Sequence, residues 1–161
     1  MNEKATLTHL NARGEAHMVD IADKADTKRI AKACGTVTCK AATVEAIFQD
    51  GLKKGDALAT ARIAGIMGAK KTSEIIPLCH PIALSHVSVD IVQKNATQIL
   101  IEVSAQSTGK TGVEMEALSA VSITALTLYD MAKAIDKNMV ISDIMLLEKS
   151  GGKSGDFVRE D

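Results

Sequence analysis

Segment 113–136 constrains the fold of this 161-residue chain more than any other. It predicts a long helix that is apolar on almost every side, whereas a surface helix carries a single apolar stripe. Its apolar residues are Val113, Met115, Leu118, Val121, Ile123, Leu126, Leu128, Met131 and Ile135. We therefore expect this helix to be covered on more than one face, by a sheet and by a second subunit.

The other predicted elements are shorter. Residue patterns predict strands over 31–40, 84–92, 98–105 and 140–147, and helices over 41–49 and 57–72. Asp56 is placed to cap the helix at 57–72, whose many glycines require close packing as compensation. Strands and helices mix without regular alternation, which indicates an α+β fold with an antiparallel sheet packed with helices.

Composition argues against several classes of function. The net charge is −1 and aromatic residues make up only 2% of the chain, so we expect no nucleic-acid partner. No apolar run approaches the roughly 20 residues that span a bilayer, so we expect no membrane partner. Cys34, Cys39 and Cys79 are irregularly spaced, which is typical of reduced thiols, and no signal-peptide pattern begins the chain. The cytoplasm is the expected compartment.

Two glycine-lysine triplets, Gly109-Lys110-Thr111 and Gly152-Lys153-Ser154, match the end of a phosphate-binding P-loop. The motif also requires an earlier glycine, but Ser104 and Leu147 hold those positions, so the ATPase motif is incomplete. Lysines nevertheless gather beside glycines and at the ends of predicted elements, where they suit an anionic substrate. They are Lys54, Lys110, Lys149 and Lys153.

Charged residues on the long helix are candidates for chemistry. Asp130 and Lys133 share a face. They form either an exposed ion pair or a carboxylate and an ammonium at a cleft, each tuning the pKa of the other. Glu114 and Glu116 lie near the helix start and point to different sides, and Glu114 also suits the helix dipole.

The proline-bracketed loop 77–81 is the third candidate. It holds Cys79 and His80 in a stiff backbone, and His80 is either a polar contact to a substrate or a buried, satisfied histidine. A zinc site would need two or more further ligands. His86 is one candidate, but no second ligand cluster is visible.

Taken together, six motifs resemble one family. They are Gly14-Glu15-Ala16-His17-Met18-Val19-Asp20, Lys54-Gly55-Asp56 with Ala59-Thr60-Ala61-Arg62-Ile63-Ala64-Gly65, Ile76-Pro77-Leu78-Cys79-His80-Pro81, Thr108-Gly109-Lys110-Thr111-Gly112-Val113-Glu114-Met115-Glu116-Ala117, Tyr129-Asp130-Met131-Ala132-Lys133, and Lys149-Ser150-Gly151-Gly152-Lys153-Ser154-Gly155-Asp156. They are similar to the cyclic pyranopterin monophosphate synthases, the molybdenum cofactor biosynthesis protein C family. The resemblance runs from about residue 14 to residue 157.

The resemblance implies a lyase that converts cyclised dihydro-GTP to cyclic pyranopterin monophosphate with release of diphosphate, by general acid/base catalysis. It implies a ferredoxin-like fold and a homohexamer, a trimer of dimers with sites at the dimer interface. No cofactor is expected, and Mg²⁺ only as a companion of the triphosphate. We expect a flexible N-terminus over 1–13, a single catalytic domain over 14–150 and a glycine-rich mobile tail over 151–161.

The same resemblance implies the site residues. The catalytic groups would be Asp130, Lys54, Lys149 and Lys133. The substrate contacts would come from Leu78, Cys79, His80, Met115, Glu116, Glu114, Asp20 and Arg29. Two other interpretations stay open: a metal-dependent hydrolase using His80, His86 and the glutamates, and a non-catalytic nucleotide-binding module built on the glycine-lysine loops.

Overall fold

A computed structural model describes residues 13–49, 51–153 and 155–160. All of the expected flexible N-terminus except residue 13 lies outside the described residues. The elements are β1 (Thr27–Thr38), α1 (Ala41–Phe48), α2 (Ala57–Lys70), α3 (Thr72–Ile75), β2 (Leu84–Asn95), β3 (Gln98–Gly109), α4 (Glu114–Ala132), β4 (Val140–Ser150) and β5 (Phe157–Val158). Every predicted helix and strand is present, and the structure adds α3 and β5, which were not predicted.

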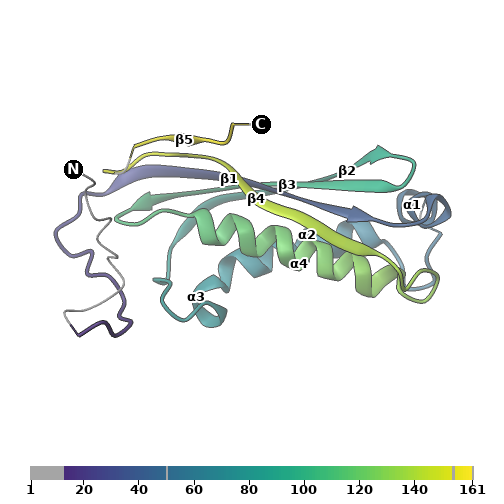
Figure 1. Cartoon of the computed structure of the whole chain (residues 1–161), viewed down its shortest axis with the longest axis horizontal. Coiled ribbons are helices and arrows are strands. Elements are labelled where there is room, and N and C mark those ends of the chain that lie inside the picture. The colour runs from purple at the N-terminus through teal and green to yellow at the C-terminus, as the bar shows by residue number, and fades with distance from the viewer. Residues whose placement is uncertain (1–12, 50, 154, 161) are drawn as a thin grey trace.

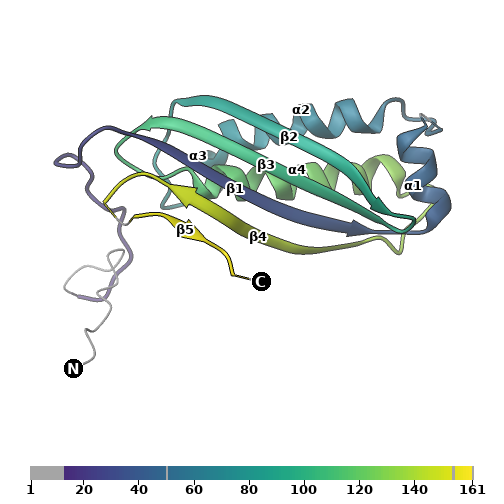
Figure 2. The ribbon, with the colours of Figure 1, turned by 90° about the horizontal axis from the view of Figure 1, so that it is seen from above.

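The strands form one antiparallel sheet in the order β2-β3-β1-β4-β5. The series β1-α2-β2-β3-α4-β4 is the split β-α-β arrangement of ferredoxin-like folds, so the predicted fold class is confirmed. Helices α2 and α4 cover one face of the sheet (Figure 1), and from above the long strands run across both helices (Figure 2). Ala31 of β1 is paired with Ala105 of β3 on one side and with Lys149 of β4 on the other.

The core lies between the sheet and these two helices. Its largest fully buried side chains are aliphatic: Ile47, Ile99, Ile101, Leu128, Val37, Val44, Val113 and Val121. Alanines at alternate positions of β1, such as Ala31 and Ala33, face the helices and let α4 approach the sheet closely. Among the described residues, the buried core is aliphatic, and the aromatic Phe48 and Tyr129 pack against it from partly buried positions.

Helix α2 packs along α4 through its glycines. A Cβ atom on Gly65 would overlap the Thr124 hydroxyl oxygen and come within 3.2 Å of the Ala120 carbonyl oxygen. The predicted cap is also present, because an Asp56 carboxylate oxygen accepts a hydrogen bond from the Ala59 amide at 2.8 Å. Part of the cover that the sequence assigned to a second subunit is therefore supplied by α2, and Leu126 is the α4 side chain that stays most exposed among the large apolar ones.

The predicted end of α4 at residue 136 was wrong, because the helix ends at Ala132. Residues 133–136 form a turn that is fastened by Asp136. Its carboxylate accepts hydrogen bonds from the amides of Lys40 at 2.9 Å and Asn138 at 3.0 Å, and these bonds hold its pKa below the usual range. This polar anchor links the turn to the start of α1 and stops the helix.

The segment expected as a mobile tail contains β5, which pairs with the end of β4. Arg159 reinforces the pairing by donating its amide to the Leu147 carbonyl and its side-chain Nε to the Leu146 carbonyl, both at 2.8 Å. Mobility of this segment stays a prediction. Within the described residues, no helix has the length and apolar character needed to cross a bilayer.

Candidate active site

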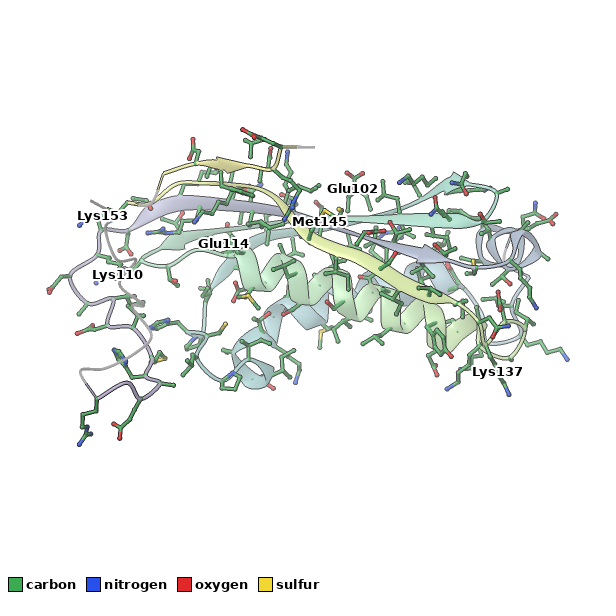
Figure 3. All side chains as sticks on the ribbon, in the orientation of Figure 1. Glu102, Lys110, Glu114, Lys137, Met145 and Lys153 are labelled. Atoms are coloured by element: carbon green, nitrogen blue, oxygen red, sulfur yellow. The ribbon has the colours of Figure 1, made fainter. Side chains whose placement is uncertain are left out.

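A cavity of about 890 Å³ opens at one end of the sheet, where β1 begins, β3 and β4 end and α4 begins. Five basic side chains line it, against three acidic ones. The basic residues are Lys24, Arg29, Lys110, Lys149 and Lys153, and the acidic ones are Asp20, Asp23 and Glu114. Lys110, Glu114 and Lys153 lie together at this end of the molecule (Figure 3). The excess of positive charge suits an anionic ligand.

Two of the predicted basic residues are held firmly at this cavity. The Lys149 ammonium pairs with a Glu114 carboxylate oxygen at 3.0 Å, and both side chains are partly buried. Arg29 is only 8% exposed, and its Nε donates a hydrogen bond to the Gly109 carbonyl at 2.8 Å. The remaining guanidinium N–H groups of Arg29 are the natural donors to an anion, because guanidinium groups match phosphate geometry.

Asp20, Asp23, Lys24 and Ala25 form one wall of the cavity. Within this wall an Asp20 carboxylate oxygen accepts the Ala22 amide at 2.8 Å. Lys110, which belongs to the first glycine-lysine triplet, donates from its ammonium to the Ala22 carbonyl. Lys110 of the triplet therefore positions this wall of the cavity.

A second cavity of about 270 Å³ shares Lys24, Thr111, Gly112 and Glu114 with the first. The predicted residues Leu78, Cys79, His80, Met115 and Glu116 all line it. The two cavities are therefore neighbours, and the proline-bracketed loop and the first turn of α4 meet there.

The fold strongly changes the pKa of the Glu116 carboxyl group. It is 3% exposed, and burial raises its pKa from 4.5 to about 7, with the nearby Glu114 charge adding to the rise. The pKa of the Cys79 thiol is raised by burial and then by Glu116. A buried carboxyl with a pKa near neutrality can both donate and accept a proton at physiological pH.

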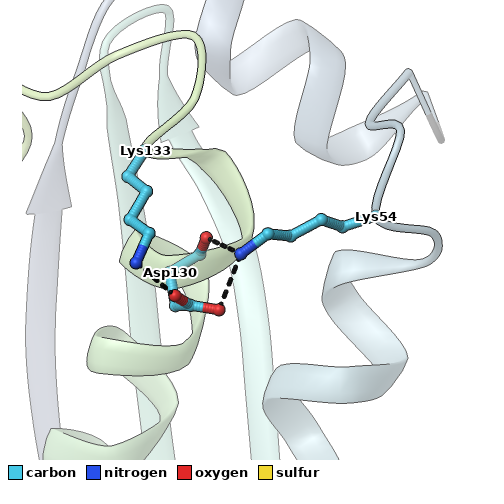
Figure 4. Close-up of polar contacts among 3 residues, drawn as sticks. All are labelled: Lys54, Asp130 and Lys133. Carbon is cyan, nitrogen blue, oxygen red and sulfur yellow. Dashed lines mark hydrogen bonds and ion pairs between the residues drawn. The ribbon is translucent and has the colours of Figure 1, made fainter.

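Lys54, Asp130 and Lys133 form a separate cluster at the other end of α4 (Figure 4). The Lys54 ammonium donates to an Asp130 carboxylate oxygen at 2.8 Å and to the Asp130 carbonyl at 2.7 Å, while Lys133 pairs with the second carboxylate oxygen at 2.7 Å. Hydrogen bonds from Lys133 and Lys54 lower the pKa of Asp130 to about 2, and Asp130 raises the pKa of Lys133. The cluster is exposed, so it adds little to stability.

The structure therefore divides the predicted site residues into two groups: those that line the two adjoining cavities, and the separate cluster of Lys54, Asp130 and Lys133. Asp20, Arg29, Glu114 and Lys149 line the larger cavity, and the 78–80 loop residues line the smaller one with Met115 and Glu116. Asp130 lies 16 residues beyond Glu114 on the same helix, a separation of about 24 Å at 1.5 Å per residue. One chain alone does not bring the two groups together.

Of the cavity lysines, Lys24 was not predicted, and Lys110 and Lys153 were predicted only as lysines that suit an anionic substrate. The glycine-lysine triplets already marked Lys110 and Lys153 as residues beside flexible backbone. Lys24 carried only a weak signal, its position in the turn before the strand that became β1. Among the residues that the structure describes, no group of three or more His, Cys, Asp or Glu side chains is arranged to hold a metal ion, so nothing there favours the hydrolase interpretation.

The fold and the two cavities define a ferredoxin-like α+β protein with a cationic ligand site beside a buried acid. Sequence comparison narrows this class, since a sequence model of the MoaC family matches residues 18–152. The chain belongs to the MoaC family. The matched range includes every predicted site residue.

Two similar proteins carry the same name, cyclic pyranopterin monophosphate synthase. The protein from Parvibaculum lavamentivorans is 56% identical over 152 residues, which cover 94% of this chain and 95% of that protein. The protein from Desulfitobacterium hafniense is 56% identical over 155 residues, which cover 96% of this chain and 95% of that protein.

Proposed function

We propose that this protein is a cyclic pyranopterin monophosphate synthase, a lyase of molybdenum cofactor biosynthesis that converts cyclised dihydro-GTP to cyclic pyranopterin monophosphate and diphosphate. The observation that carries the proposal is the meeting of five basic side chains at a cavity that adjoins the buried acid Glu116. The family membership and the names of two relatives at 56% identity support it.

The larger cavity suits the triphosphate. Its volume of about 890 Å³ falls within the range of small-molecule sites. When a hydroxyl oxygen of the substrate attacks the α-phosphorus, its proton passes to a base and diphosphate leaves with its negative charge. Arg29 and the surrounding lysines stabilise that charge, since cationic groups beside a transferring phosphoryl group lower the barrier.

The smaller cavity suits the ring system. It lies between the 78–80 loop and the first turn of α4, with Leu78 and Met115 as apolar walls. Opening the purine-derived ring and closing the pyranopterin needs proton transfers at several atoms. Glu116 suits these transfers because its pKa of about 7 lies near the working pH, where proton exchange is most effective. The catalytic lysines that the family resemblance implies are assigned to the remaining transfers.

We also infer that a complete site contains Lys54, Asp130 and Lys133 from a second copy of the chain. Their cluster lies about 24 Å along α4 from Glu114, so a single chain offers the cationic cavity without them. An assembly in which the end of α4 from one subunit meets the cavity of another supplies all twelve predicted residues at one place. The hexamer with sites at the dimer interface is the assembly we propose.

Turnover by purified variants tests the function. Wild-type protein should convert cyclised dihydro-GTP to a product with the mass of cyclic pyranopterin monophosphate, while Lys54→Ala and Lys149→Ala should not. Lys54→Arg and Lys149→Arg should also stay inactive, because arginine does not release its proton in proteins. Activity in the arginine variants would show that these lysines only bind the charge of the substrate. Reversible binding of cyclised dihydro-GTP without product would favour the nucleotide-binding module. We place the enzyme in the cytoplasm and propose that any Mg²⁺ arrives with the triphosphate.

A further inference from the structure

Two consecutive glycines close over Arg29 at the rim of the larger cavity. Gly151 and Gly152 follow β4 directly and have φ angles of +89° and +87°, in the left-handed region that favours glycine. A Cβ atom on Gly151 would overlap the Lys28 carbonyl oxygen. A Cβ atom on Gly152 would overlap Nη1 of Arg29 and lie 2.9 Å from Cζ and 3.2 Å from Nη2. The guanidinium group therefore lies directly against the backbone of Gly152.

The guanidinium group has little freedom to move away. Arg29 is 8% exposed, and its Nε is bonded to the Gly109 carbonyl at 2.8 Å. At Gly152, the space that a side chain would need is already filled by the terminal nitrogens of a fixed group.

The loop that carries Gly152 is tied at its base. The Gly151 amide donates to an Asp156 carboxylate oxygen at 3.1 Å. Phe157 then pairs with Lys149, and Val158 with Glu148, so that β5 returns along the edge of the sheet. These ties keep the backbone of Gly152 over Arg29.

We propose that Gly152 is a positioning residue: it holds the terminal nitrogens of Arg29 in the one place where they clamp the phosphates of the substrate. The inference rests on the proposed function, because it assigns Arg29 to the triphosphate. Any side chain at Gly152 displaces the guanidinium group and removes charge-assisted hydrogen bonds to the anion, while the fold stays the same.

The competing explanation is that position 152 requires glycine only because its φ angle is positive, whatever lies beside it. Gly155 is the matched control, since it lies in the same loop at a φ of +72° and a Cβ atom there would meet nothing within 4 Å. Gly155→Ala imposes similar backbone strain without the contact to Arg29. A difference between the two variants therefore isolates the contact.

Calorimetric titration with inorganic tripolyphosphate tests the proposal without requiring turnover. Gly152→Ala should weaken binding about tenfold or more, the loss expected when hydrogen bonds to a charged group are misplaced. Gly155→Ala should stay within about twofold of wild type. In an Arg29→Ala background, adding Gly152→Ala should change the affinity by less than about twofold, because the contact no longer exists.

Equal losses in Gly152→Ala and Gly155→Ala, or a Gly152→Ala loss that persists in the Arg29→Ala background, would overturn the proposal, as would wild-type protein that binds no tripolyphosphate. If Gly152→Ala does not fold, the double variant Arg29→Ala/Gly152→Ala must fold, since removing the guanidinium group makes room, and its failure would also overturn the proposal. If the Gly152→Ala loss depends on Arg29 as expected but the wild-type protein makes no cyclic pyranopterin monophosphate, the result counts against the proposed function and not against the role of Gly152.

Discussion

Mixed assemblies of two inactive variants test whether the catalytic groups come from two subunits. Glu114, the partner of Lys149, and Asp130, the partner of Lys54, are 16 residues apart on α4, about 24 Å at the helical rise. No lysine side chain spans that distance. Lys54→Ala and Lys149→Ala should therefore each be inactive alone, yet complement each other when they are assembled together.

The expected yield follows from counting. Each shared site needs Lys149 from one subunit and Lys54 from its neighbour. In a random one-to-one assembly each of these lysines is present with a probability of about one half, so about a quarter of the sites in a symmetric oligomer are complete. Co-expression with two different tags and purification over both gives the mixed protein. The rate of cyclic pyranopterin monophosphate formation, divided by that of wild type, is the measurement.

A matched mixture separates the alternatives further. Wild type combined with the double variant Lys54→Ala/Lys149→Ala should also reach about a quarter of wild-type activity in a random assembly if the site is shared between subunits. If each chain held a complete site, this mixture would reach about half, and the two single variants would give none. That second pattern would refute the shared site.

Two further predictions concern the fold and the buried acid. The pKa of Glu116 is about 7 in the folded protein against 4.5 for a free side chain. The folded state thus keeps a proton that the unfolded state releases, and the free energy of unfolding should fall by up to about 3 kcal/mol as the pH rises from 4.5 to 7. Glu116→Gln should lack this part of the decline in urea unfolding at several pH values, and equal slopes in both proteins would contradict the assignment. Gly65→Ala should destabilise the protein by about 1–3 kcal/mol through overlap with Thr124, although alanine is the better helix former. Gly109→Ala, whose Cβ atom would meet nothing within 4 Å, should change the unfolding free energy by no more than about 0.5 kcal/mol.

The regular elements were predictable because their signals are local. Hydrophobic periodicity and the Asp56 cap act over a few residues, so the strands and long helices fell close to their predicted positions. The errors arose where distant residues decide. The end of α4 depends on contacts between Asp136 and the start of α1, and β5 depends on the edge that β4 offers.

For the candidate site, the sequence offered candidate residues but not their geometry. Motifs marked Lys149, Glu114 and Glu116 as candidates, because charged residues beside glycines or at the start of a helix are visible in local patterns. Their environment was not visible in those patterns. The raised pKa of Glu116 comes first from burial by the surrounding structure, and the Glu114–Lys149 ion pair joins residues that are 35 positions apart in the chain.

By itself, the sequence determined the long strands and helices, the α+β class, the family and the residues that carry charge, because these depend on short-range patterns. Only the tertiary structure decided which of those residues meet. The sheet order brings Arg29 and Lys149 to one end of α4 and leaves Lys54 with Asp130 at the other. The glycines of the second triplet likewise proved to be the backbone that lies over Arg29. Contacts between residues far apart in the chain depend on how the whole sheet and its helices pack, and local sequence patterns do not record that packing.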